Sequence, residues 1–166
     1  MDEPNWLAYA RTLVGVREIP GAKHSATIMG WIKSLGAKRL GISVTNDETP
    51  WCGTFCAHVM DHVGIAPPPI AVRASAWSAW GRGLLNPRPG CILTFTRQGG
   101  GHVGLYVGED DTHLHVLGGN QGNAVSVTRI AKDRLSAMRW PDGVFLPSPK
   151  IVRLRPDGAP VTVNER

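Results

Sequence analysis

The spacing of apolar residues changes at Pro89-Gly90, and this change limits the folds that the chain can adopt. Before it, apolar residues recur at helical spacing in four segments, 5–14, 25–35, 51–64 and 74–81. After it come short β-rich segments separated by Gly, Asn or Asp, namely CILTF, HVGLYVG, THLHVLGG, AVSVTRI and SAMRW. Helices followed by an antiparallel sheet predict an α+β fold, with N-terminal helices packed on a C-terminal sheet.

Three of the predicted helices carry recognisable end signals. Asn5 and Ser25 are suited to be the N-caps of the first and second helices. Gly36 is a natural end for the second helix, and the third should end near Gly64. Residues 36–50 are predicted to form a loop between the second and third helices.

Length and composition favour one globular domain. The chain has 166 residues, of which 42% are hydrophobic and 19% charged. We expect this domain to span residues 1–146, with residues 147–166, rich in Pro and charge, as an edge strand or tail. Apolar runs are too short for a transmembrane helix, so no stable membrane insertion is expected. The N-terminus does not read as a classical secretory signal.

Charge narrows the partners only slightly. The net charge is +5, which favours a polyanionic surrounding such as an anionic cell-wall polymer. No Lys/Arg block and no nucleic-acid motif stand out, so we do not expect nucleic acid to be bound. Three cysteines without regular spacing do not form a disulfide scaffold.

The segment TPWCGTFCAHVMDHVG, residues 49–64, contains a candidate nucleophile. Pro50 favours the start of a helix, which places Cys52 in its first turn. Backbone N–H groups and the helix dipole stabilise a thiolate at that position, and lowered thiol pKa values are typical of it. Gly53 would leave room for a substrate, and Trp51 beside the nucleophile would line the substrate groove.

Cys56 and two histidines of the same segment suggest a zinc site, which helix geometry argues against. At about 100° per residue, Cys52 and Cys56 lie near 0° and 40°, whereas His58 and His62 lie near 240° and 280°. One helix cannot direct both pairs at one ion, and the usual zinc spacings are absent. We predict no metal or other cofactor and interpret Cys56 as core packing.

His102 is the best candidate for the base that a thiol nucleophile requires. It begins a predicted strand in GGGHVGLYVG, where glycines on both sides allow a close approach. Alternation would direct Val103, Leu105 and Val107 to the core and His102 to the other face. His113 and His115, on the next strand, are interpreted as exposed alternates.

An amide after the next strand could orient this histidine. The segment VLGGNQGN follows, and an amide beside the histidine strand can accept the second ring N–H. We predict Asn120 in this role, with Gln121 as the reserve candidate. The same residues also suit an ordinary turn.

Together, PWCGTFC, PGCILTF, GGGHVGLYVG and VLGGNQGN resemble the CHAP and NlpC-type cysteine peptidases and amidases within the papain-like superfold. The resemblance runs from VGVREIPG, residues 14–21, to about residue 146, and is closest to a phage and prophage endolysin-like subgroup. Each motif alone is weak, whereas the four in this order are fairly specific.

The resemblance implies a hydrolase of bacterial peptidoglycan, which we expect to be a monomer. Cys52 would be the nucleophile, His102 the general base and acid, and Asn120 the orienting group. The Cys52 backbone N–H would bind the oxyanion, with Trp51, Gly53 and Gln121 as further candidates for substrate or oxyanion binding. The enzyme would cut an amide bond in the peptide part of the wall, as an endopeptidase or N-acetylmuramoyl-L-alanine amidase, reaching the wall or periplasm from the cytoplasm or virion.

Two departures from the family pattern and several alternatives remain. Relatives commonly have Asp after Pro-Gly where this chain has Cys91, which could approach Cys56 as a reduced pair. The acidic residues Asp47 and Glu48 are too few for a calcium loop. The alternatives are an antibacterial effector amidase, a thiol acyltransferase or deamidase on the same superfold, and a non-catalytic virion or wall-binding module.

Overall fold

The computed structural model describes residues 3–19, 24–41, 50–97 and 100–161. Its helices are α1 (Asn5–Thr12), α2 (Ala26–Leu40), α3 (Cys52–His62) and two short 3₁₀ helices, η1 (Ala74–Ala79) and η2 (Lys132–Arg134). Its strands are β1 (Arg82–Gly83), β2 (Ile92–Arg97), β3 (Gly100–Glu109), β4 (His113–Gly118), β5 (Ser126–Ala131) and β6 (Leu135–Trp140). The predicted α+β class, with helices before an antiparallel sheet, is confirmed.

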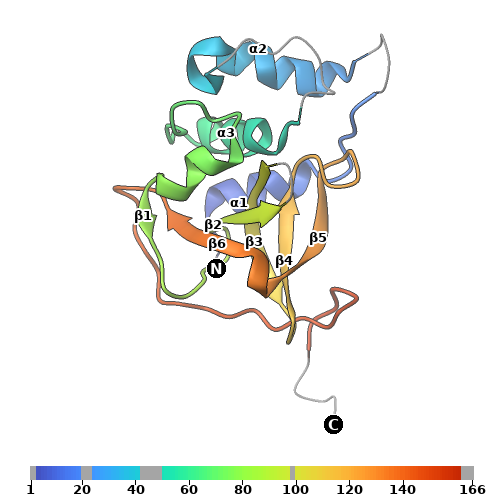
Figure 1. Cartoon of the computed structure of the whole chain (residues 1–166), viewed down its shortest axis with the longest axis vertical. Helices are drawn as coiled ribbons and strands as arrows, with labels where there is room; N and C mark the ends of the chain where they lie inside the picture. Colours follow the sequence, from blue (N-terminus) through green and yellow to red (C-terminus); the bar gives the residue numbers. More distant parts are fainter. Residues whose placement is uncertain (1–2, 20–23, 42–49, 98–99, 162–166) are drawn as a thin grey trace.

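Within the described residues, the strands form one antiparallel sheet in the order β1-β6-β2-β3-β4-β5. The helix α3 packs against β3, and α2 packs on the other side of α3, so that α3 lies between α2 and the sheet (Figure 1). The central strand β3 and the first half of α3 therefore face each other across the core.

The helix ends agree with the sequence in part. The Ser25 hydroxyl accepts a hydrogen bond from the Ile28 N–H at 3.3 Å, which confirms this N-cap. Asn5 is the first residue of α1 and Pro4 is its cap, so the predicted Asn5 cap is wrong by one position. Gly36 adopts a left-handed φ of 74°, yet the chain resumes a helical path to Leu40, so the second helix does not end there.

The five predicted strands are all present, and the two-residue β1 was too short to predict. The alternation expected for β3 is wrong, because both of its faces are buried. His102 and Tyr106 are as inaccessible as Val103 and Leu105. The strand lies in the middle of the sheet and is covered on both sides, so its burial has no period of two.

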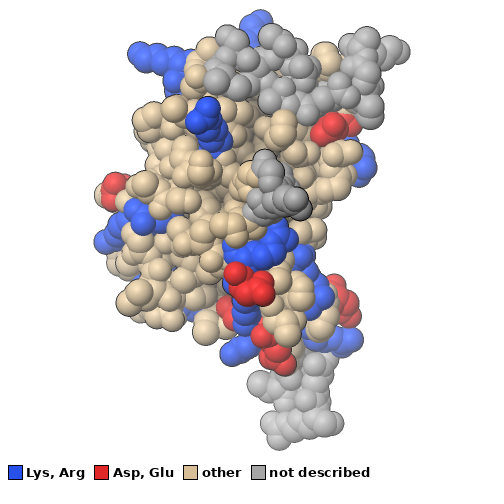
Figure 2. Space-filling model, viewed as in Figure 1, with Lys and Arg blue, Asp and Glu red and all other residues tan. Residues whose placement is uncertain are grey.

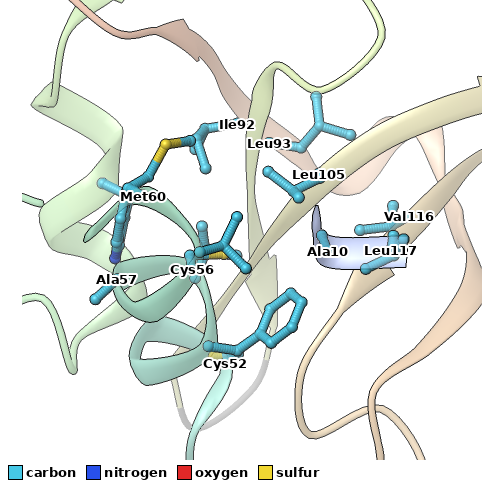
Figure 3. Packing of buried hydrophobic residues seen from close by; sticks show 14 of the residues in the cluster. Ala10, Cys52, Cys56, Ala57, Met60, Ile92, Leu93, Leu105, Val116 and Leu117 are labelled. Carbon is cyan, nitrogen blue, oxygen red and sulfur yellow. The ribbon is translucent and has the colours of Figure 1, made fainter. Parts of the chain in front are cut away.

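Apolar side chains from α3 and the sheet form the core. Figure 3 shows Cys52, Cys56 and Met60 on successive turns of α3, in the same cluster as Ile92 of β2 and Leu105 of β3. All of these residues are at most 3% exposed. None of the helices in the described ranges is both long and apolar enough to cross a bilayer.

The segment after Pro147 is attached to the end of β3. The Glu109 N–H donates to the Val152 carbonyl, and the Leu154 N–H donates to the Glu109 carbonyl, both at 2.8 Å. A Cβ at Gly108 would lie 2.3 Å from Leu154 Cδ1, so the segment packs closely on the strand at this glycine. Arg153 forms an isolated parallel bridge with Glu109, and within the described residues no strand is assigned after Trp140.

Candidate active site

Cys52 is the first residue of α3, as predicted. Trp51 is the N-cap, and its carbonyl accepts the first intrahelical hydrogen bond from the Phe55 N–H at 2.9 Å. The N–H groups of a first helical turn have no acceptor within their own helix, and the helix dipole favours a negative charge beside them. This position suits both a thiolate and the binding of an oxyanion by the Cys52 N–H.

The other two thiols are poor nucleophiles. Cys56 and Cys91 are fully buried. Burial, followed by the negative charge of a Cys52 thiolate, raises the pKa of the Cys56 thiol well above its ordinary value. Burial also raises the pKa of Cys91 to about 12. All three cysteines are free of disulfides, and the predicted core role of Cys56 agrees with its position.

His102 lies in the buried part of β3, opposite Phe95 of β2, and is 3% exposed. Its Nε2 lies 2.8 Å from Oε1 of Gln121. The contact is fully enclosed, since Gln121 is 8% exposed. A hydrogen bond in such a setting holds the ring firmly, because water does not compete for it.

The surroundings of Gln121 determine which way its amide points. Its Nε2 donates to the Val116 carbonyl at 3.1 Å and to the Ser126 carbonyl at 2.6 Å. A carbonyl only accepts, so the NH₂ group must face these two oxygens, and Oε1 must face His102. His102 therefore donates its Nε2–H to Gln121. In the neutral imidazole the proton is then on Nε2, which leaves Nδ1 as the basic nitrogen.

The prediction that Asn120 makes this contact is corrected by the structure. Asn120 is partly exposed and has a left-handed φ of 58°, as turn residues often do. The next residue, Gln121, is the one whose amide reaches the ring. Gln121, the reserve candidate, therefore makes the contact that was predicted for Asn120.

Two consecutive glycines at the end of β4 bring the histidine close to the cysteine helix. A Cβ at Gly118 would lie 2.8 Å from Gln121 Oε1 and 3.5 Å from His102 Nε2. A Cβ at Gly119 would lie 2.5 Å from Phe55 Cβ and 2.8 Å from the Trp51 ring. The His102–Gln121 pair and the first turn of α3 thus contact adjacent residues of one short turn.

Two predicted substrate contacts are corrected. Trp51 is 1% exposed, and its indole N–H donates to the Glu18 carboxylate at 2.9 Å, so it is a buried support and does not line an open groove. The space beside Gly53 is already filled, since a Cβ there would lie 2.1 Å from the Ala71 carbonyl oxygen. Gly53 allows α3 to approach this loop and does not make room for a substrate.

Glu18 was not predicted as a site residue. It lies 33 positions before Trp51, in a segment without regular secondary structure. A single carboxylate at that separation carries no sequence signal for a contact with the cysteine helix. The acidic residues Asp47 and Glu48 lie outside the described ranges.

The remaining histidines have other partners. His58 stacks on Trp31, His62 stacks on Tyr9, and the Tyr9 hydroxyl lies 2.7 Å from His58 Nε2. Burial, with the neighbouring His62, lowers the pKa of His58 to about 4.

No group of three or more His, Cys, Asp or Glu is placed to hold a metal ion in the part of the chain that the structure describes.

His115 is corrected from an exposed alternate to a buried residue. It is 2% exposed, and its Nε2 contacts the Asp110 carboxylate at 2.7 Å. Arg129 on β5 binds both oxygens of that carboxylate, at 2.8 and 3.0 Å. The Arg129 guanidinium, followed by the other hydrogen bonds that Asp110 accepts, holds the pKa of this carboxyl well below its usual range. The cluster joins β4, β5 and the turn before β4.

No protein-family model matches this chain, and no curated protein is significantly similar to it in sequence.

Proposed function

We propose that the chain is a papain-like cysteine hydrolase that cleaves an amide bond in the peptide part of bacterial peptidoglycan. The observation that carries the proposal is the buried His102–Gln121 pair, which lies next to the turn that also contacts the first turn of α3. Its hydrogen bond uses Nε2 and leaves Nδ1 as the basic nitrogen. A cysteine at a helix start, a histidine and an orienting amide are the parts of a thiol amidase.

The chemistry follows from these positions. The Cys52 thiolate attacks the amide carbonyl carbon, and the Cys52 N–H stabilises the oxyanion that forms. The His102 imidazolium then gives its proton to the leaving amine as the C–N bond breaks, which leaves a thioester. Neutral His102 takes a proton from water, and the resulting hydroxide attacks the thioester carbonyl carbon. The C–S bond then breaks, which releases the acid and regenerates the Cys52 thiolate and the His102 imidazolium.

The substrate class rests on the motifs and is consistent with the charge. The four motifs resemble those of peptidoglycan peptidases and amidases, as described above. Basic residues are dispersed over the face shown in Figure 2, with acidic residues among them near its lower end. Dispersed positive charge favours general attraction to an anionic envelope over recognition of one nucleic-acid groove.

Digestion of purified peptidoglycan is expected to release free amino groups without new reducing sugar ends. Mass spectrometry of the soluble products should show fragments that gain one water at a peptide or sugar-proximal amide, which identifies the bond. An acyltransferase would instead join the acyl part to an added amine. Reducing ends alone, or no change with folded protein, would rule out the proposed activity.

Replacing Gln121 with methionine is expected to lower kcat by about a hundredfold, because the ring loses the acceptor that fixes its tautomer. Methionine has similar length and volume, so the turn should persist. The matched control is Asn120→Gly, which removes the neighbouring amide and keeps the left-handed backbone. It should retain most of the activity. The opposite order of effects would return the orienting role to Asn120.

A further inference from the structure

Glu18 makes two hydrogen bonds that lead to the two halves of the proposed site. Its carboxylate Oε1 accepts from the Trp51 indole N–H at 2.9 Å. Its backbone N–H donates to the Asn123 carbonyl at 3.0 Å. The first partner immediately precedes Cys52, and the second lies two positions after Gln121.

On the cysteine side, the bond holds the start of α3. Trp51 is the N-cap of this helix and is almost fully buried. Its ring also packs near Gly119 and lies 6.2 Å from the Trp31 ring, centroid to centroid. The half-buried Glu18 carboxylate accepts the indole N–H, and a hydrogen bond to a carboxylate is stronger than one between neutral groups, so it restrains the Trp51 side chain.

On the histidine side, the bond reaches the turn that presents Gln121. The Gln121 N–H donates to the Ala124 carbonyl at 2.9 Å, and the Ser126 hydroxyl donates to the Gln121 carbonyl at 3.0 Å. Asn123 lies inside this closed turn. A displacement of Asn123 would therefore be transmitted to Gln121 and to the ring that it holds.

The segment that carries Glu18 is itself fixed to the same turn. The Gly15 N–H donates to the Val125 carbonyl at 2.9 Å, and the Val125 N–H donates to the Val16 carbonyl at 2.8 Å. Arg17 forms an antiparallel bridge with Ala124. The backbone around Glu18 is thus hydrogen-bonded to the turn on the histidine side, and the Glu18 side chain extends from it to the cysteine helix.

We propose that Glu18 is a positioning residue that sets the separation between Cys52 and the His102–Gln121 pair by joining Trp51 to the turn at Asn123. This inference rests on the proposed function. A misplacement of about 1 Å between reacting groups can lower a rate by about a hundredfold. Loss of the Glu18 contact should therefore affect kcat more than KM.

The test compares Glu18→Ala with Glu18→Gln in peptidoglycan hydrolysis. Alanine should lower kcat at least tenfold and change KM by less than about twofold. Glutamine retains an oxygen acceptor for the indole, so it should restore most of kcat. The matched control is Glu3→Ala, which removes an acidic residue paired with the exposed Arg11 and should leave kcat unchanged.

A double-mutant cycle isolates the Glu18–Trp51 contact. Trp51→Phe removes the indole N–H. It should therefore lower kcat much less in the Glu18→Ala background than in the wild-type protein. Independent effects of the two substitutions, or a Glu18→Gln variant as slow as Glu18→Ala, would overturn the proposed role.

A second measurement does not depend on the substrate. The rate of Cys52 alkylation by iodoacetamide, followed against pH with Cys52→Ala as the blank, reports how well His102 supports the thiolate. Glu18→Ala should shift this profile, and Glu18→Gln should restore it. If peptidoglycan stays intact with wild-type protein, this result refutes the proposed function and does not refute the positioning role. An unshifted profile with folded Glu18→Ala refutes the positioning role.

Discussion

Replacing Cys52 with alanine is expected to abolish hydrolysis, whereas Cys56→Ala should keep most of the activity. Only Cys52 lies in the first turn of α3, where helix N–H groups support a thiolate and an oxyanion. Cys56 is one turn further along, and burial keeps its thiol protonated. Loss of the nucleophile removes the covalent step and leaves no group at that position to replace it.

Residual hydrolysis of peptidoglycan by the two variants, measured as amino groups released per hour, checks this prediction. Thermal unfolding of both variants shows whether each is folded, since Cys56→Ala removes a small part of the core and should cost about 1 kcal/mol. Substantial turnover by Cys52→Ala, or an inactive but folded Cys56→Ala variant, would mean that the wrong sulfur has been assigned.

Local patterns in the sequence were sufficient to predict that Cys52 lies at a helix start and to predict the order of helices and strands. Pro50, followed by apolar residues at helical spacing, placed Cys52 at a helix start, which the structure shows. The β-rich segments after Pro89 form the strands β2 to β6 of the sheet. These features depend on the spacing of neighbouring residues, which a single sequence contains.

The choice between Asn120 and Gln121 could not be made in this way. Both are amides in one turn, and which of them points inward depends on the backbone angle at Asn120. Burial of β3 on both faces was equally hidden, because it depends on elements distant in the sequence. For the same reason Trp51 and Gly53 were misinterpreted, since their neighbours Glu18 and Ala71 come from other segments.

Replacing Gly119 with alanine is expected to lower both stability and activity. The new Cβ would lie 2.5 Å from Phe55 Cβ and 2.8 Å from the Trp51 ring, so α3 must move away from the turn. Overpacking of this kind can lower the free energy of unfolding by about 3 kcal/mol. For a chain of this length that corresponds to a fall in Tm of about 6–12 °C.

Two further alanine variants separate displacement of the helix from disturbance of the histidine. Gly118→Ala would press mainly on the Gln121 amide, the end of a flexible side chain, so it should lower kcat with a smaller change in Tm. Gly30→Ala adds the same methyl group in open space on α2 and should raise Tm slightly, because alanine is the better helix former. If Gly119→Ala unfolds at the wild-type temperature with full turnover, the first turn of α3 does not rest on this glycine. The cysteine and the histidine must then be held together by other contacts.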